Sequence, residues 1–81
     1  GSGQGMAMRA NKYSYIRAAL CWNTEIARLA REHNDANVLC LGARHTDSEL
    51  ASEIVRDFLK TPFAGGRHQQ RVAKLCSAFH T

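Results

Sequence analysis

The sequence predicts an α/β domain with a parallel sheet covered by helices, and three observations support this. Residues 38–41 are apolar at consecutive positions, which is typical of a strand buried on both faces. A second apolar segment, residues 16–21, is separated from the first by a helical pattern, as in a pair of parallel strands. The chain also opens on a glycine-rich loop, which in such folds joins a strand to a helix.

The first half of the chain is expected to run from a loop through a helix, a strand and a second helix. Residues 6–12 are good helix formers apart from Asn11. Asn23 can cap a helix over residues 24–33. That helix would carry an apolar face at the spacing i, i+3, i+4, formed by Ile26, Leu29 and Ala30.

Two helices are expected after the second strand. Thr46 and Glu49 form a capping box, with Thr46 as the cap. The helix that follows would end near Pro62, and a last helix would begin near Arg67, after two glycines. The apolar residues expected to face the core are Leu50, Ile54, Val55 and Phe58 in the first of these helices, and Val72, Leu75, Cys76 and Phe79 in the second.

Two strands make a poor sheet alone, and no strand precedes the glycine loop. Residues 1–81 are therefore interpreted as the C-terminal part of a single domain whose N-terminal half is absent. An alternative interpretation of Gly1, Ser2 and Gly3 is the remnant of a cloning linker.

The composition narrows the class of protein. The net charge is +4, but acidic residues lie between the basic ones, so a groove for nucleic acid is not expected. Only residues 65–71 concentrate positive charge, as in a local anion site. No apolar run is long enough to span a membrane. The three cysteines lack metal-ligand spacing and are expected as core residues in a reducing cytosol.

Residues 1–5 are the first segment that could carry chemistry. The glycines Gly1, Gly3 and Gly5 let backbone amides turn toward an anion, and the Ser2 hydroxyl could add a hydrogen bond. Such amides could hold an oxyanion or an enediolate. An ordinary turn is the alternative.

His33 and Asn34 are the second candidate, at the end of a helix that leads into a strand. Histidine is a residue type suited to proton transfer, and His33 could be directed into a cleft, with Asn34 beside it. Ordinary helix-capping chemistry explains the same pair.

Basic residues around the last helix form the third candidate. Arg67 and Arg71 are four residues apart, and paired guanidiniums near free helix N–H groups suit a phosphate monoester. His68 flanks them, and Arg44 follows a strand end, where ligands sit in doubly wound folds. Solvated surface residues are the alternative.

In order, these segments resemble the family of ribose-5-phosphate isomerase type B and galactose-6-phosphate isomerase. The resemblance runs from Gly1 to about Leu75, and its most specific motifs read REHNDANVL and GGRHQQR. It identifies the opening glycines as an active-site loop. It implies a Rossmann-like three-layer sandwich, usually a dimer with active sites at the subunit interface. It also implies aldose–ketose isomerisation of a sugar phosphate, in the cytoplasm, without metal or cofactor.

The resemblance also implies roles for the candidate residues. Ser2 matches the loop hydroxyl near the substrate, and the backbone of Gly1, Gly3 and Gly5 matches the anion hole. His33 matches the residue that opens the furanose ring, and Asn34 matches a contact to the sugar. The phosphate clamp is matched by Arg67 and Arg71, with Arg44 and His68 close to it.

The proton-abstracting base is missing from these matches. In many members it is a cysteine immediately before the loop, and other members have a glutamate where this chain has Met6. We therefore expect an isomerase of the cysteine type whose isolated fragment is inactive, with ribose 5-phosphate favoured over six-carbon substrates. A non-catalytic module that binds a sugar phosphate is the alternative.

Overall fold

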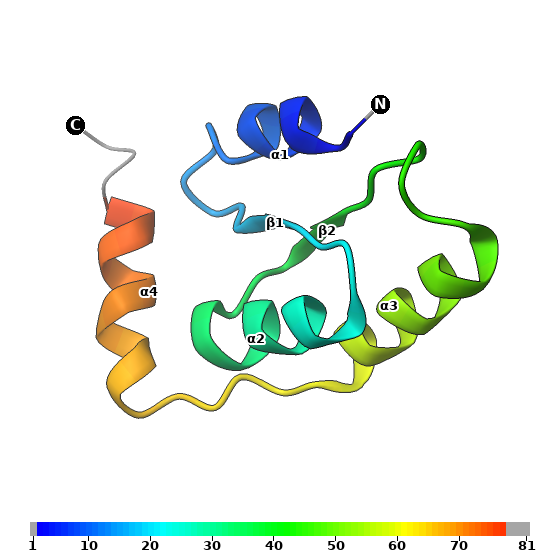
Figure 1. The fold of residues 1–81 in the computed structure, drawn as a ribbon. Helices are drawn as coiled ribbons and strands as arrows, with labels where there is room; N and C mark the ends of the chain where they lie inside the picture. The colour runs from blue at the N-terminus through cyan, green and yellow to red at the C-terminus, as the bar shows by residue number, and fades with distance from the viewer. Residues whose placement is uncertain (1, 78–81) are drawn as a thin grey trace.

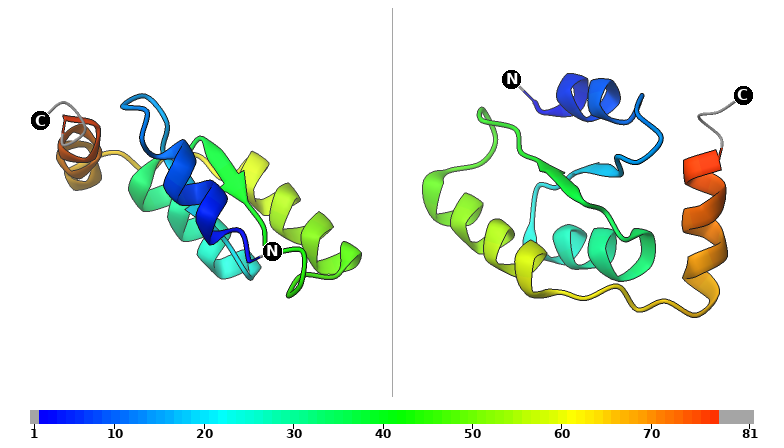
Figure 2. Two further views of the ribbon diagram at one scale, coloured as in Figure 1. Left: turned by 90° about the horizontal axis from the view of Figure 1, so that it is seen from above. Right: turned by 180° about the vertical axis from the view of Figure 1, so that it is seen from behind.

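The computed structural model describes residues 2–77, and in this part of the chain it has six elements. They are α1 (Gln4–Ala10), β1 (Ala18–Leu20), α2 (Thr24–Asn34), β2 (Val38–Cys40), α3 (Ser48–Lys60) and α4 (Arg67–Ser77). Helix α1 lies on one side of the sheet, and α2 and α3 lie on the other (Figures 1 and 2). Helix α4 stands beside α2 at one end of the molecule (Figure 1). The predicted α/β arrangement is confirmed.

Strands β1 and β2 pair in parallel, as predicted, with Ala19 opposite Leu39. Each strand has three residues, which is shorter than expected. Helices cover both faces of the sheet, but all six strand residues are only half-buried, so the prediction of a fully buried strand is wrong for this chain. Two strands offer too little sheet for the helices to enclose.

The core lies between the sheet and the α2–α3 pair. It is formed by buried residues from several elements, namely Cys21, Ala27, Ala30, Ala36, Ile54 and Phe58. Ile54 and Phe58 follow Leu50 at four-residue steps, which keeps them on one face of α3. Val55 falls off this stripe and is exposed.

Asn23 caps α2 as predicted, because its side-chain oxygen accepts a hydrogen bond from the Ile26 amide at 2.8 Å. Ala27 and Ala30 are the buried residues of α2, whereas Leu29 is partly exposed. Small residues at the buried positions let α2 lie close to the sheet and to α3.

The prediction of Thr46 as the cap of α3 is wrong. Asp47 caps this helix, and its carboxylate accepts a hydrogen bond from the Leu50 amide at 2.8 Å. The extended backbone at Asp47 starts the helix one residue later than expected. The helix ends at Lys60, where the Thr61 hydroxyl donates to the Asp57 carbonyl at 2.6 Å.

Helix α4 begins at Arg67, as predicted. Gly65 and Gly66 precede it with φ values of 71° and 56°, which glycine adopts at little cost. Leu75 remains exposed on α4, while the Cys76 side chain and Phe79 lie outside the described residues. No helix within residues 2–77 is long and apolar enough to cross a membrane.

Candidate functional site

The glycine loop is packed tightly against the carboxyl ends of both strands. Gly3 has φ 87°, and a Cβ there would stand 2.7 Å from a Leu20 methyl carbon and 2.9 Å from the Leu41 carbonyl oxygen. Across the contact, a Cβ on Gly42 would stand 2.6 Å from the Ser2 carbonyl oxygen. Only glycine fits at Gly3 and Gly42, so close packing sets the path of the loop.

Ser2 and the first turn of α1 face a cavity of about 220 Å³. The Ser2 hydroxyl accepts a hydrogen bond of 3.4 Å from the Gln4 amide. The cavity is lined by residues of three segments, the start of α1, the end of β1 and the loop after β2, namely Ser2, Gln4, Leu20, Cys21, Trp22, Gly42, His45 and Thr46. A Cβ on Gly5 would meet open space, so packing does not explain glycine there. Gly1 lies outside the described residues.

Cys21 forms part of the wall of this cavity. Burial, and secondarily the neighbouring Cys40, raises the pKa of the Cys21 thiol to about 11. Burial also raises the pKa of Cys40. A thiol with so high a pKa stays protonated at neutral pH, so Cys21 is a poor base and a poor nucleophile.

A second group of polar side chains gathers where α2 and α4 meet. The rings of His33 and His68 are stacked, with centroids 4.3 Å apart and planes inclined by 16°. His68 is buried, and its Nδ1 atom has no hydrogen-bond partner among residues 2–77. Burial of the ring and the nearby charges of His33, Arg67 and Arg71 lower the pKa of His68.

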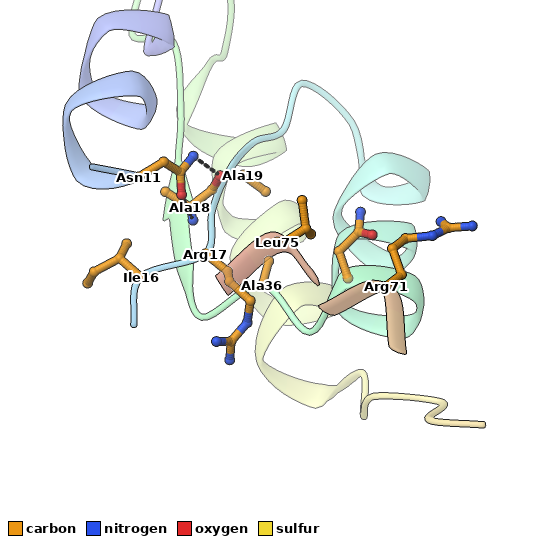
Figure 3. Close-up of a pocket in the computed structure, with 9 residues that line it drawn as sticks. Asn11, Ile16, Arg17, Ala18, Ala19, Ala36, Arg71 and Leu75 are labelled. Atoms are coloured by element: carbon orange, nitrogen blue, oxygen red, sulfur yellow. Dashed lines mark hydrogen bonds between the residues drawn. The ribbon is translucent and has the colours of Figure 1, made fainter. Parts of the chain in front are cut away.

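Arg71 and Asn34, which directly follows His33 in the chain, line a cavity of about 350 Å³. Figure 3 shows Arg17 and Arg71 on two sides of the hollow, with their guanidinium groups pointing away from one another. Within residues 2–77, neither Arg67 nor Arg71 forms an ion pair with a carboxylate. The guanidinium groups of Arg67 and Arg71 are therefore available to bind an external anion.

The free helix amides expected at the start of α4 are only partly present. The amides of His68 and Gln69 donate to the carbonyls of Gly65 and Gly66, each at 3.1 Å. These tight turns use two of the donors that a helix N-terminus usually leaves open. An anion here would depend mainly on the arginines.

The predicted residues therefore form two separate groups. Ser2 and Gly3 lie at the carboxyl ends of the strands, and Arg44 follows Gly42 at that same end. His33, Asn34, Arg67 and Arg71 belong to the α2–α4 end, and Figure 1 shows α4 across the molecule from the start of α1. Within one chain the structure does not bring Arg44 beside Arg67. No group of three or more His, Cys, Asp or Glu side chains within residues 2–77 could hold a metal ion.

Comparison with known proteins identifies the family to which this chain belongs. Residues 1–75 match the family described as Ribose/Galactose Isomerase. The chain belongs to this family. It is 53% identical over 76 residues to the probable ribose-5-phosphate isomerase B of Mycoplasma genitalium, which covers 93% of this chain and 49% of the relative. It is 49% identical over 72 residues to ribose-5-phosphate isomerase B of Escherichia coli, or 89% of this chain and 48% of that protein.

Solved structures of the family have the same fold. The type B ribose 5-phosphate isomerase of Trypanosoma brucei superposes with a TM-score of 0.93 at 52% identity, covering 96% of this chain and 53% of that one. The Rossmann-like assignment is thus confirmed for the part present. The chain spans about half the length of the relatives that it matches.

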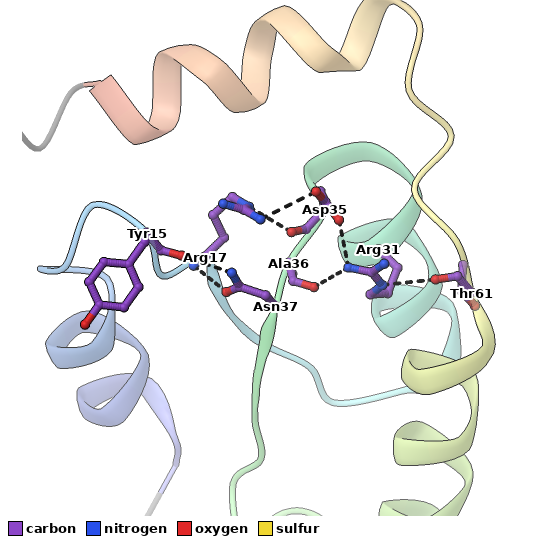
Figure 4. A network of polar contacts seen from close by, with 7 residues as sticks. All are labelled: Tyr15, Arg17, Arg31, Asp35, Ala36, Asn37 and Thr61. Atoms are coloured by element: carbon purple, nitrogen blue, oxygen red, sulfur yellow. Dashed lines mark hydrogen bonds and ion pairs between the residues drawn. The ribbon is translucent and has the colours of Figure 1, made fainter.

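In this family member, a polar network fixes the turn that follows His33 and Asn34 (Figure 4). Asp35 ends α2 with φ 48° and accepts from Arg31 at 3.0 Å and from Arg17 at 3.4 Å. Arg31 also donates to the carbonyls of Ala36 at 2.6 Å and Thr61 at 3.0 Å.

Sequence reasoning missed Arg17, Arg31 and Asp35 as positioning residues. The spacing of Arg31 and Asp35, one helical turn apart, was the available signal for one of these contacts. The contact from Arg17 joins residues 18 positions apart and has no local pattern.

Proposed function

We propose that the protein is an aldose–ketose isomerase that interconverts ribose 5-phosphate and ribulose 5-phosphate. The carrying observation is the α2–α4 end, where Arg71 and Asn34 line a cavity of about 350 Å³. His33 directly precedes Asn34 and stacks on His68. Within residues 2–77, Arg67 and Arg71 form no ion pair with a carboxylate. Family membership and relatives named ribose-5-phosphate isomerase B support this proposal.

The geometry supports a division of roles. Arg67 and Arg71 hold the phosphate, which orients the sugar far from the reacting carbons. His33 protonates the ring oxygen and opens the furanose, while Asn34 contacts the sugar. Proton transfer between C1 and C2 then passes through an enediolate. The amides of the glycine loop stabilise its negative charge, with Ser2 nearby.

The abstracting base is proposed to be a cysteine immediately before Gly1. Cys21 lines the loop cavity, but its raised pKa of about 11 argues against it as the base. A cysteine at the N-terminal side of the loop would stand beside backbone amides, which lower a thiol pKa.

The proposed assembly is a homodimer with the active site at the subunit interface. One chain carries the glycine loop and the arginine pair at different ends, so the loop of one copy could meet the arginines of another. Such a site would need no partner other than the sugar phosphate. We place the enzyme in the cytoplasm, where its cysteines stay reduced.

The test is an assay of ribose 5-phosphate conversion on the native-length protein. His33→Ala is compared on ribose 5-phosphate and on an aldose phosphate that cannot close a furanose ring. We expect metal-independent turnover, with the variant impaired mainly on the ring-forming substrate. Equal loss on both substrates would contradict the ring-opening role.

The same assay separates the alternatives. Turnover of six-carbon aldose phosphates alone would reassign the substrate. A folded protein that binds sugar phosphates but converts none would favour a binding module.

A further inference from the structure

The stacked histidines differ from an ordinary surface pair because both rings are held in place. His68 is only 9% exposed, and its ring lies 4.3 Å from that of His33. The loop before α4 is tied to α2 by the Ala64 amide, which donates to the Glu32 carbonyl at 3.0 Å. Since the rings are fixed at this distance, two positive charges on them would repel strongly. A positive charge on one ring therefore disfavours a second charge on the other, so the pair can hold at most one proton.

The charges that act on His68 are all positive. His33 acts from α2, and Arg67 and Arg71 act from α4 itself. The segment 61–66, which joins α3 to α4, has no charged side chain. The closest acidic turn residue, Asp35, is already paired with arginines. Protonation of the pair is opposed as long as no anion is present.

The buried Nδ1 atom of His68 points to a ligand. It has no partner among residues 2–77, and an unpaired buried polar atom is costly. An anion bound by the two arginines would offset their positive charge near His68. It could also accept a hydrogen bond from a protonated ring.

We propose that His33 and His68 share one proton, and that an anion held by Arg67 and Arg71 draws this proton from solvent onto the pair. Phosphate binding would then supply the acid that His33 needs for ring opening. His68 is thus a positioning and proton-sharing residue. This inference rests on the proposed function, in which the two arginines bind the substrate phosphate.

The test is the pH dependence of sulfate binding to the native-length protein, measured by calorimetry. Sulfate keeps its charge throughout the titration of histidine, so a change in affinity reports on the protein. A ligand that raises the pKa of the pair binds more tightly to its protonated form. We therefore expect the affinity to fall at least about fivefold between pH 5.5 and pH 8.

The double variant with His33→Gln and His68→Gln should bind sulfate with nearly constant affinity over this range. Arg56→Gln is the control, since it removes an exposed positive charge of α3 that belongs to neither the loop nor the α2–α4 end, and it should keep the pH dependence. Persistence of the full dependence in the double variant would overturn the inference.

Two further results separate this inference from the proposed function. If the unaltered protein binds sulfate with the same affinity at every pH, the shared proton is ruled out, while the proposal that the arginines bind the phosphate still stands. Absence of sulfate binding at every pH overturns the clamp itself, and the inference with it. In the free protein, His33→Gln should raise the pKa of His68 seen by NMR, and an unchanged value would contradict sharing.

Discussion

The glycine loop and the α2–α4 end are held in place by different forces. At the loop, backbone atoms and small residues touch so closely that Gly3 and Gly42 have no room for a side chain. At the α2–α4 end, charged side chains and hydrogen bonds hold the turn after α2, which lies near two stacked histidines and an open cavity. In the proposed function, fixed amides at the loop would bind an enediolate through their shape. Charge at the α2–α4 end would attract the phosphate before the sugar is aligned.

Arg31→Ala is expected to have the largest effect, because it breaks the network at the α2–α4 end. The Arg31 guanidinium donates to the Ala36 and Thr61 carbonyls and stacks over Phe58 at 5.8 Å. Its loss leaves partly buried acceptors unpaired, and we expect about 3 kcal/mol less stability in denaturant unfolding.

Arg28→Ala is the matched control for that variant. Arg28 pairs with Asp57 at 2.9 Å but is 45% exposed, against 21% for Arg31. A surface pair contributes less than about 1 kcal/mol. Equal losses in the two variants would show that the Arg31 network does not hold the turn.

The effect of pH on stability tests whether the Cys21 thiol is buried behind the glycine loop. Its pKa of about 11 lies above the usual thiol value of about 9, so the unfolded chain loses the proton first as the pH rises. Stability is thus complete below about pH 9 and is lost toward pH 11, by about 2 to 3 kcal/mol.

The comparison is between the unaltered protein and Cys21→Ala, by denaturant unfolding at pH 8 and pH 11. The variant lacks the titrating group and should lose less stability over this interval. Parallel losses would mean that the Cys21 thiol is not protected by burial.

Gly42→Ala tests shape at the loop. The added Cβ meets the Ser2 carbonyl oxygen at 2.6 Å, so the loop must move. We expect a loss of about 2 kcal/mol in unfolding, in the range of overpacked cores. Gly5→Ala meets open space within α1 and should be neutral or slightly stabilising. Destabilisation by both variants would contradict the special fit at Gly42.

Arg67→Ala tests whether charge at the α2–α4 end binds the phosphate, and its expected effect is the smallest of the four. Loss of one phosphate contact should raise the Michaelis constant for ribose 5-phosphate about tenfold, with kcat little changed. Arg56→Ala removes an exposed arginine of α3 and should leave both constants unaltered. A fall in kcat without a change in the Michaelis constant would show that Arg67 acts in the chemical step and not in substrate binding.

Local patterns predicted most of the elements. Asn23 as a cap, the two-glycine start of α4 and the stripe of Leu50, Ile54 and Phe58 depend on neighbours within a few residues. The cap of α3 was misplaced by one residue because Thr46 and Asp47 both suit the position. The roles of the site residues came from the resemblance and stay predictions.

The sequence by itself determined the order of helices and strands, the parallel pairing and the family. Short-range periodicity predicts the elements, and short motifs indicate the family. Only the tertiary structure decided that His33 stacks on His68, that Gly42 meets Ser2, and that the loop and the arginine pair lie at different ends. These contacts join residues distant along the chain. Their geometry depends on how α2, α4 and the loop pack, which no local pattern encodes.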